Sequence, residues 1–192
     1  MACSFSGVVL AGGRAQRMDG VEKGLMLYQG KPMIARVAQA MEGLTKSIVL
    51  NVNRQFRDYQ ELGYPLLHDA DEYAERGPLS GLWSALSQAS CGHLLVAPCD
   101  TPNISSAAFA ALLEASQSRP EQIHCLASAS GIHPLHAIIP VESALLCLTN
   151  RLAESSQNSV LGFYRQHGFA ELLWHHEDEL LNVNYHDQLT RS

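Results

Sequence analysis

The chain has 192 residues, of which 46% are hydrophobic and 17% are charged, and its net charge is −6 at pH 7. This length and composition predict one ordered globular domain and exclude a disordered or fibrous chain. The negative net charge argues against broad binding to nucleic acids or membrane surfaces. An anionic ligand would therefore have to be held by local positive charge.

Five cysteines are spread along the chain without any Cys-x-x-Cys pair. The odd number and the spacing indicate neither a disulfide framework nor a structural zinc site, so we expect reduced thiols and a cytoplasmic location. The N-terminus has no basic region before its short apolar run, so it does not read as a secretory signal. No apolar stretch approaches the ~20 residues that span a bilayer.

The first motif is an apolar run, 8–10, that predicts a buried strand and changes abruptly into a glycine-rich loop. The loop carries two adjacent glycines and three cations: Gly12, Gly13, Arg14, Arg17 and Lys23. Backbone N–H groups and cations at a strand end form an anion site, for which phosphates are the best candidates. The loop is neither a Walker A motif nor a Gly-x-Gly-x-x-Gly fingerprint. The alternative is a turn with solvated basic side chains.

Hydrophobic spacing predicts alternating strands and helices over the first part of the chain. The predicted strands are 8–10, 47–52, 65–69 and 93–98, and the predicted helices are about 32–44, 55–62, 78–89 and 105–116. This alternation predicts a parallel α/β sheet with right-handed crossovers. Strand 93–98 is the most continuously apolar, which is typical of the middle of such a sheet. Ser105 is the expected N-cap of the last helix.

The second half of the chain is less regular. Strands are predicted at 123–127, 137–140 and 170–174, and helices at 141–154, 160–167 and, briefly, after 181–184. The first two strands would be antiparallel neighbours around His133-Pro134. We expect a single domain, 1–192, with a nucleotide-binding half of about residues 1–100 and an acceptor-binding half of about residues 101–192.

Polar side chains lie at or just past the carboxyl ends of three of the predicted strands, at the edge where open α/β sheets bind ligands. Asp100 comes directly after the apolar strand, and one carboxylate next to phosphates is a natural Mg²⁺ ligand. Asn51 could hydrogen-bond a base or ribose, and Asp69 could bind a guanine edge or a ribose hydroxyl. The alternative for each is an ordinary helix or turn cap. Cys99 is expected to be a small buried residue rather than a nucleophile.

Candidates for the acceptor side lie in the second half. Asn182 and Asn184 alternate along a predicted strand end, so their side chains should point the same way. His133 is a third candidate. Solvent-facing polar residues on a loop or edge are the alternative for all three.

Taken in order, these motifs resemble the molybdenum cofactor guanylyltransferases, a family of nucleotidyltransferases with a glycosyltransferase-A-like fold. The matching residues are Val9-Leu10-Ala11-Gly12-Gly13, Arg17-Met18, Lys23, Asn51-Val52-Asn53-Arg54, Asp69, Gly77-Pro78-Leu79-Ser80-Gly81, Pro98-Cys99-Asp100-Thr101-Pro102, His133-Pro134 and Asn182-Val183-Asn184. The resemblance implies a Rossmann-like, three-layer αβα domain with a mostly parallel central sheet. The stretch at 98–102 is the most specific, because related cytidylyltransferases typically carry Asp-Met-Pro there.

The resemblance implies Mg²⁺-dependent transfer of GMP from GTP to molybdenum-bound molybdopterin, with release of pyrophosphate. It implies nucleotide contacts from Leu10, Ala11, Gly12, Gly13, Lys23, Asn51, Asp69 and Asp100. Lys23, Asp100 and Arg17 would be the catalytic residues, and Asp100 would bind Mg²⁺. Asn182 and Asn184 would lie on the pterin side.

Other functions stay open on the sequence alone. The chain could use CTP with molybdopterin, use UTP or CTP with a sugar phosphate, or be an inert GTP-binding regulatory module. Other molybdenum cofactor biosynthesis proteins and molybdoenzyme chaperones are candidates for transient contacts. Nucleic acid and membranes are not expected as partners.

Overall fold

The computed structural model describes residues 5–11, 17–18, 21–74, 76–154 and 158–183. Within them, a seven-stranded sheet has the strand order β11-β9-β10-β8-β1-β6-β7. Its strands are β1 (Phe5–Leu10), β6 (Ser47–Asn51), β7 (Leu66–Leu67), β8 (His93–Pro98), β9 (Ile123–Ser128), β10 (Gly131–Pro140) and β11 (Phe169–Leu173). The prediction that strand 93–98 lies at the centre is confirmed, because β8 has three strands on either side.

The sheet is mostly parallel, as the alternating pattern predicts. Strands β7, β6, β1 and β8 pair in parallel, and β11 pairs in parallel with β9. Strand β10 is antiparallel to both of its neighbours. The carboxyl ends of all the other strands in the sheet therefore meet at one edge.

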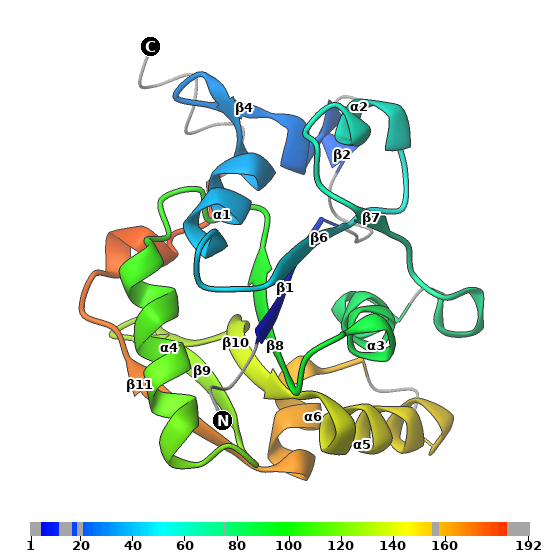
Figure 1. Cartoon of the computed structure of the whole chain (residues 1–192), viewed down its shortest axis with the longest axis vertical. Helices are drawn as coiled ribbons and strands as arrows, with labels where there is room; N and C mark the ends of the chain where they lie inside the picture. The colour runs from blue at the N-terminus through cyan, green and yellow to red at the C-terminus, as the bar shows by residue number, and fades with distance from the viewer. Residues whose placement is uncertain (1–4, 12–16, 19–20, 75, 155–157, 184–192) are drawn as a thin grey trace.

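Helices cover both faces of this sheet, which makes three layers (Figure 1). The helices are α1 (Met33–Met41), α2 (Phe56–Gln60), α3 (Pro78–Gln88), α4 (Ser106–Ser118), α5 (Val141–Glu154) and α6 (Val160–His167). Helices α1 and α4 pack on one face, and α3, α5 and α6 pack on the other. The expected αβα architecture is confirmed.

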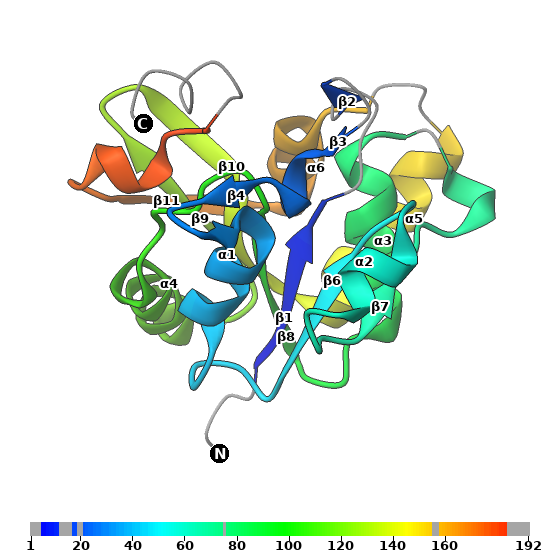
Figure 2. The same cartoon turned by 90° about the horizontal axis from the view of Figure 1, so that it is seen from above.

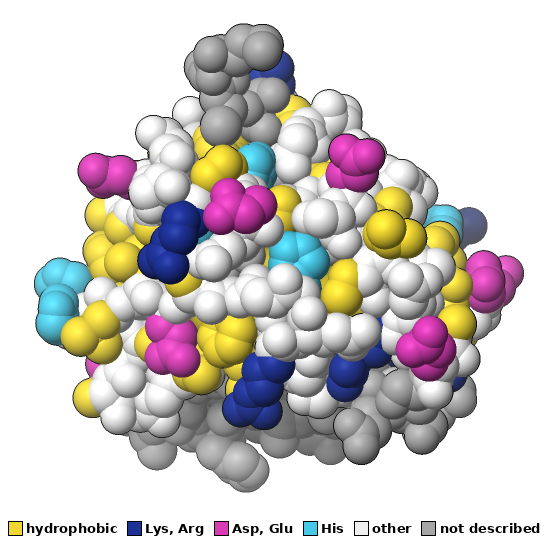
Figure 3. All heavy atoms as spheres, turned by 90° about the horizontal axis from the view of Figure 1, so that it is seen from below, with side chains coloured by type: hydrophobic (Ala, Val, Ile, Leu, Met, Phe, Trp, Pro, Cys, Tyr) yellow, Lys and Arg dark blue, Asp and Glu magenta, His cyan; other side chains and the backbone are white. Residues whose placement is uncertain are grey.

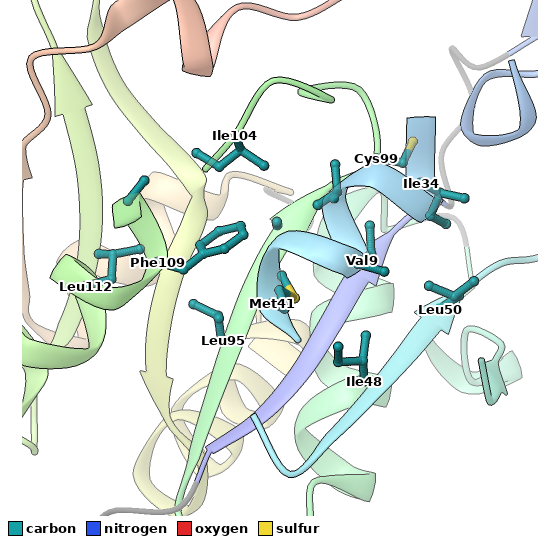
Figure 4. Packing of buried hydrophobic residues seen from close by; sticks show 14 of the residues in the cluster. Val9, Ile34, Met41, Ile48, Leu50, Leu95, Cys99, Ile104, Phe109 and Leu112 are labelled. Carbon is teal, nitrogen blue, oxygen red and sulfur yellow. The ribbon is translucent and has the colours of Figure 1, made fainter. Parts of the chain in front are cut away.

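Helix α1 shows how the sequence builds this packing. Its apolar residues recur at helical spacing, so one face of the helix can be buried against the sheet. Ile34 and Met41 of α1 are fully buried with Val9 of β1 and Phe109 of α4 (Figure 4). The helix is shorter than the predicted 32–44, and Gly43 follows it with a φ of 76°, a left-handed conformation that favours glycine.

The largest difference from the sequence prediction concerns β10. The strand begins at Gly131 rather than at residue 137, so His133 and Pro134 lie in a strand and not in a loop. The register with β9 shifts between His133 and Ala137. Proline cannot donate to a strand ladder and is accommodated at such irregularities, which hides the strand from its sequence pattern.

Two short hairpins were also absent from the prediction. They are β2 (Arg17–Met18) with β3 (Val21–Glu22), and β4 (Leu27–Tyr28) with β5 (Lys31–Pro32). Between β4 and β5, Gln29 and Gly30 both have positive φ, as two-residue hairpin turns often require. The Ser105 cap is confirmed, because its side chain accepts a hydrogen bond from the Ala108 N–H.

Residues 181–183 are not a strand, contrary to the prediction, and they follow the 3-10 helix η3 (Glu177–Leu180). The predicted terminal helix lies outside the described residues.

Of the helices described, none is long and apolar enough to cross a membrane. The face drawn in Figure 3 carries charges of both signs, with Lys and Arg side chains interspersed among Asp and Glu.

Candidate active site

The candidate site lies at the edge where β1, β6, β7 and β8 end. In Figure 2, β1 points toward this edge, where β2, β3 and β4 lie, and the N-terminus is on the opposite side. The Ala11 N–H donates to the Asn51 carbonyl at 2.9 Å, and the Cys99 N–H donates to the Leu10 carbonyl at 3.0 Å. These bonds hold the ends of the three strands together just before the glycine-rich loop begins.

Lys23 and Asp100 form an ion pair at this edge. Lys23 begins the 3-10 helix η1 (Lys23–Leu25), and Asp100 lies two residues beyond β8. The Lys23 Nζ lies 2.8 Å from Asp100 Oδ2, and the two side chains are 17% and 20% exposed. Both side chains can still be reached from solvent. A polyanion could therefore replace Asp100 as the partner of the ammonium, and a cation could replace Lys23 as the partner of the carboxylate.

Asn51 and Asp69 contact each other directly. The Asn51 Nδ2 donates to Asp69 Oδ1 at 3.0 Å. Asn53 completes the group, because its Nδ2 donates to Asp69 Oδ2 at 2.8 Å and its Oδ1 accepts from the Asp69 N–H at 2.9 Å. The carboxylate is therefore held by both of its oxygens, and its orientation is fixed.

Asn53 was not among the sequence-predicted site residues, although the Asn-x-Asn spacing at 51–53 could have indicated it. Gly81 is a second residue whose role the sequence did not show. An added Cβ at Gly81 would clash with the Asn51 side-chain oxygen and lie 3.1 Å from the Leu10 Cδ2. The glycine in helix α3 thus makes room for Asn51 beside the end of β1.

A cavity of about 440 Å³ opens beside Asp69. Its lining combines polar, charged and aromatic side chains from Asn53, Arg54, Phe56, His68, Asp69, Asp71 and Ala74. The rings of Phe56 and His68 pack edge to face, with their centroids 5.1 Å apart. Asp69 therefore lies between the network with Asn51 and an open cavity that has both polar and apolar walls.

One candidate for the acceptor side, His133, lies near the start of β10. The Ser128 Oγ lies 3.0 Å from His133 Nε2 and donates to Glu177 Oε1 at 3.3 Å. Burial lowers the pKa of His133, against an opposing influence of the Glu177 carboxylate. The hydroxyls of Ser130 and Ser128 lower the pKa of Glu177. At neutral pH this corner therefore presents a carboxylate beside a neutral imidazole.

The end of the described chain returns to the same edge. The Val183 N–H donates to the Asp100 carbonyl at 2.8 Å, which places the exposed Asn182 one residue from that contact. Asn184, Gly12, Gly13 and Arg14 lie outside the described residues. Of Arg17, only the backbone is described, in β2.

Cys99 is buried, as expected. Burial, reinforced by the Asp100 carboxylate, raises the pKa of its thiol to about 12. A thiolate is the reactive form of cysteine, so this group is not a nucleophile at neutral pH.

The side chains at this edge could bind Mg²⁺ through a single carboxylate. In the described part of the chain, no three His, Cys, Asp or Glu side chains converge as a metal cage. Mg²⁺ is usually bound through one or two carboxylates together with phosphate oxygens and water. Asp100 is a carboxylate of this kind, next to the loop expected to hold phosphates.

Comparison with known proteins decides the family. A family model described as the MobA-like NTP transferase domain matches residues 7–169. A molybdenum cofactor guanylyltransferase from Pasteurella multocida is 32% identical over 184 residues, covering 96% of each chain. One from Histophilus somni (strain 2336) is 34% identical over 168 residues, covering 87% of this chain and 84% of that relative. The chain belongs to the molybdenum cofactor guanylyltransferase family. It is a nucleotidyltransferase, as the resemblance of its motifs implied.

Solved structures confirm the fold of this family member. The molybdopterin-guanine dinucleotide biosynthesis protein A from Archaeoglobus fulgidus aligns with a TM-score of 0.76 and 19% identity, covering 97% of this chain and 95% of that one. A 4-diphosphocytidyl-2C-methyl-D-erythritol synthase from Anaerococcus prevotii aligns with the same TM-score and 10% identity, covering 98% and 94%. Proteins named for different nucleotidyl products thus share the architecture, so the fold by itself does not identify the substrate.

Proposed function

We propose that this protein transfers GMP from GTP to molybdenum-bound molybdopterin, forming the guanine dinucleotide form of the cofactor and releasing pyrophosphate. The names of the relatives support the guanylyl transfer. The observation that carries the proposal is the juxtaposition of the Lys23–Asp100 pair and the Asn51–Asp69 network at one sheet edge. The half of about residues 1–100 would hold GTP, and the half of about residues 101–192 would hold the acceptor.

The proposed reaction places few demands on acid–base chemistry. A terminal phosphate oxygen of molybdopterin forms a bond to the α-phosphorus of GTP, the bond from that phosphorus to the bridging oxygen breaks, and its electron pair leaves with pyrophosphate. A phosphate is already anionic at neutral pH, so no general base has to activate it. The main barrier is the repulsion between two polyanions and their positioning.

Each candidate residue has a role in this scheme. The Lys23 ammonium would stabilise the negative charge that develops on the departing pyrophosphate, assisted by Arg17. Asn51 and Asp69 would orient the nucleoside, and main-chain groups of Leu10, Ala11, Gly12 and Gly13 would contact the nucleotide. Asp100 would hold Mg²⁺, which supplies charge neutralisation on the phosphate oxygens when bound.

The acceptor side rests on a smaller set of residues. Asn182, Asn184 and His133 are proposed to contact molybdopterin. Val183 contacts the backbone of Asp100, and His133 belongs to the polar corner at the start of β10. Both positions are consistent with an acceptor that approaches the nucleotide from this half of the sheet.

A nucleotide panel tests the proposal. The protein is mixed with Mg²⁺ and GTP, CTP, UTP or ATP in turn, and thermal stabilisation is measured, followed by pyrophosphate release on addition of molybdenum-bound molybdopterin. GTP should stabilise most and should alone support release. Stabilisation only by CTP or UTP would favour a related transferase, and GTP binding without release would favour an inert binding module.

A further inference from the structure

A buried hydrogen bond lies directly behind the Asp100 turn. The Thr101 Oγ1 lies 2.8 Å from the His136 Nε2, and both side chains are buried. Thr101 is the residue after Asp100, whereas His136 comes from the irregular part of β10, between His133 and Ala137. The pair therefore links the end of the central strand to its antiparallel neighbour.

The other ring nitrogen of His136 has a different environment. Its Nδ1 is buried and has no hydrogen-bond partner among the described residues. Burial, with a smaller contribution from His133, lowers the pKa of His136 to about 3, so the ring is neutral. A buried N–H without a partner is rarer in proteins than an unpaired acceptor. We therefore assign the tautomer in which Nε2–H donates to the Thr101 hydroxyl.

The Asp100 backbone is held from several directions. The preceding Cys99 N–H donates to Leu10, and the Asp100 carbonyl accepts from Val183. The Thr101–His136 bond adds a side-chain anchor on the next residue. The Asp100 carboxylate itself extends toward Lys23 on the open side. The main chain is thus fixed while the carboxylate remains at the surface of the site.

We propose that His136 is a positioning residue for nucleotidyl transfer, because its bond to Thr101 fixes the turn that presents Asp100. This inference rests on the proposed function only through the role of Asp100. An apolar residue would fill the same space without leaving a buried nitrogen unpaired, so simple core packing does not explain a histidine here. The expected consequence is kinetic, because displacing a reacting group by about 1 Å can cost about 100-fold in rate.

The test compares three single variants and the double variant His136→Leu with Thr101→Val against a matched control. His136→Leu and Thr101→Val each remove one side of the bond, and His136→Gln keeps a polar group that can reach Thr101. The control is His124→Leu, because His124 is also buried, lies in β9, and donates through Nε2 to the Arg119 carbonyl at 3.0 Å. All are assayed by kcat, KM for GTP and thermal stability.

His136→Leu and Thr101→Val should each lower kcat by about 10- to 100-fold. The KM for GTP should change less than kcat. His136→Gln should recover a large part of the rate, and the double variant should be no worse than either single variant, because both remove the same bond. His124→Leu should lower stability but leave kcat near the wild-type value. Independent, additive losses, or equal kcat losses in His136→Leu and His124→Leu, would overturn the positioning role.

A second measurement separates this inference from the proposed function. Binding of Mn²⁺ together with GTP, followed by electron paramagnetic resonance, reports on Asp100 without the acceptor. Weaker Mn²⁺ binding in His136→Leu and Thr101→Val, but not in His124→Leu, supports the positioning role even if wild-type protein transfers no GMP. Unchanged Mn²⁺ binding in both variants, together with unchanged kcat, would refute it.

Discussion

The Lys23 ammonium donates a hydrogen bond of 2.8 Å to the Asp100 carboxylate, although 77 positions separate the two residues in sequence. Lys23 is the last cation of the glycine-rich loop and begins η1, whereas Asp100 follows the central strand. The contact gives each charge a partner. In the proposed reaction, Lys23 would turn to the phosphates and Asp100 to the metal when a nucleotide and a cation enter, so that neither charge would be left unpaired.

Replacing Asp100 with Ala should abolish transfer while the protein remains folded, because the variant removes the proposed Mg²⁺ ligand. Pyrophosphate release at saturating GTP and a circular dichroism melt measure the two properties. Asp178→Ala, which removes an exposed carboxylate from η3, serves as the control and should retain full activity. Normal turnover by the Asp100 variant would refute the metal assignment.

Replacing Lys23 with Met should lower kcat/KM by about 100-fold, the usual effect of losing one donor to a developing negative charge. The matched control is Lys31→Met, because Lys31 is exposed and bonds only weakly, at 3.3 Å, to Gln39. Steady-state kinetics with GTP as the varied substrate measures both. Equal rates for the two variants would show that Lys23 has no part in the reaction.

Asp69→Ala should reduce discrimination among nucleotides more than it reduces the rate of transfer. The variant frees the amides of Asn51 and Asn53 from the bonds that orient them. The measurement is the ratio of kcat/KM values for GTP and CTP, which should fall toward one. If that ratio stays at the wild-type value, Asp69 does not contribute to selection of the nucleoside.

Gly81→Ala should weaken GTP binding, because the added methyl group would displace Asn51 from Asp69. Overpacking of this kind also typically destabilises a core by about 1–3 kcal/mol. Gly92→Ala is the control, since no heavy atom of the described residues, apart from its two chain neighbours, lies within 4 Å of the added Cβ there. Calorimetric titration with GTP and a urea melt should separate the pair, and equal affinities would show that Asn51 tolerates the shift.

Cys99→Ala should retain most of the activity from pH 7 to 9. Burial holds the thiol pKa at about 12 in the folded protein, so the thiol stays protonated throughout this range and cannot act as a nucleophile. A pH–rate profile compares the variant with the wild-type protein. Loss of activity in the variant without loss of stability would argue for a chemical role.

Much of the architecture could be predicted from the sequence because it depends on local patterns. Strand β8 has the predicted bounds 93–98, and helices α5 and α6 coincide with their predicted ranges. Each of these elements buries an apolar face. Its apolar run or helical periodicity therefore indicates its bounds in the sequence. The start of β10 at Gly131 was not predicted, because Pro134 and the register shift interrupt the strand's sequence pattern.

The residue types of the candidate site, and the order in which they follow the strands, are determined by the sequence alone. Only the tertiary structure decided which of them meet. It joined Lys23 to Asp100, added Asn53 to the Asn51–Asp69 group, and placed His136 behind Thr101. Periodicity encodes which face of an element is buried, whereas contacts between distant side chains depend on strand order and register, which local patterns do not encode.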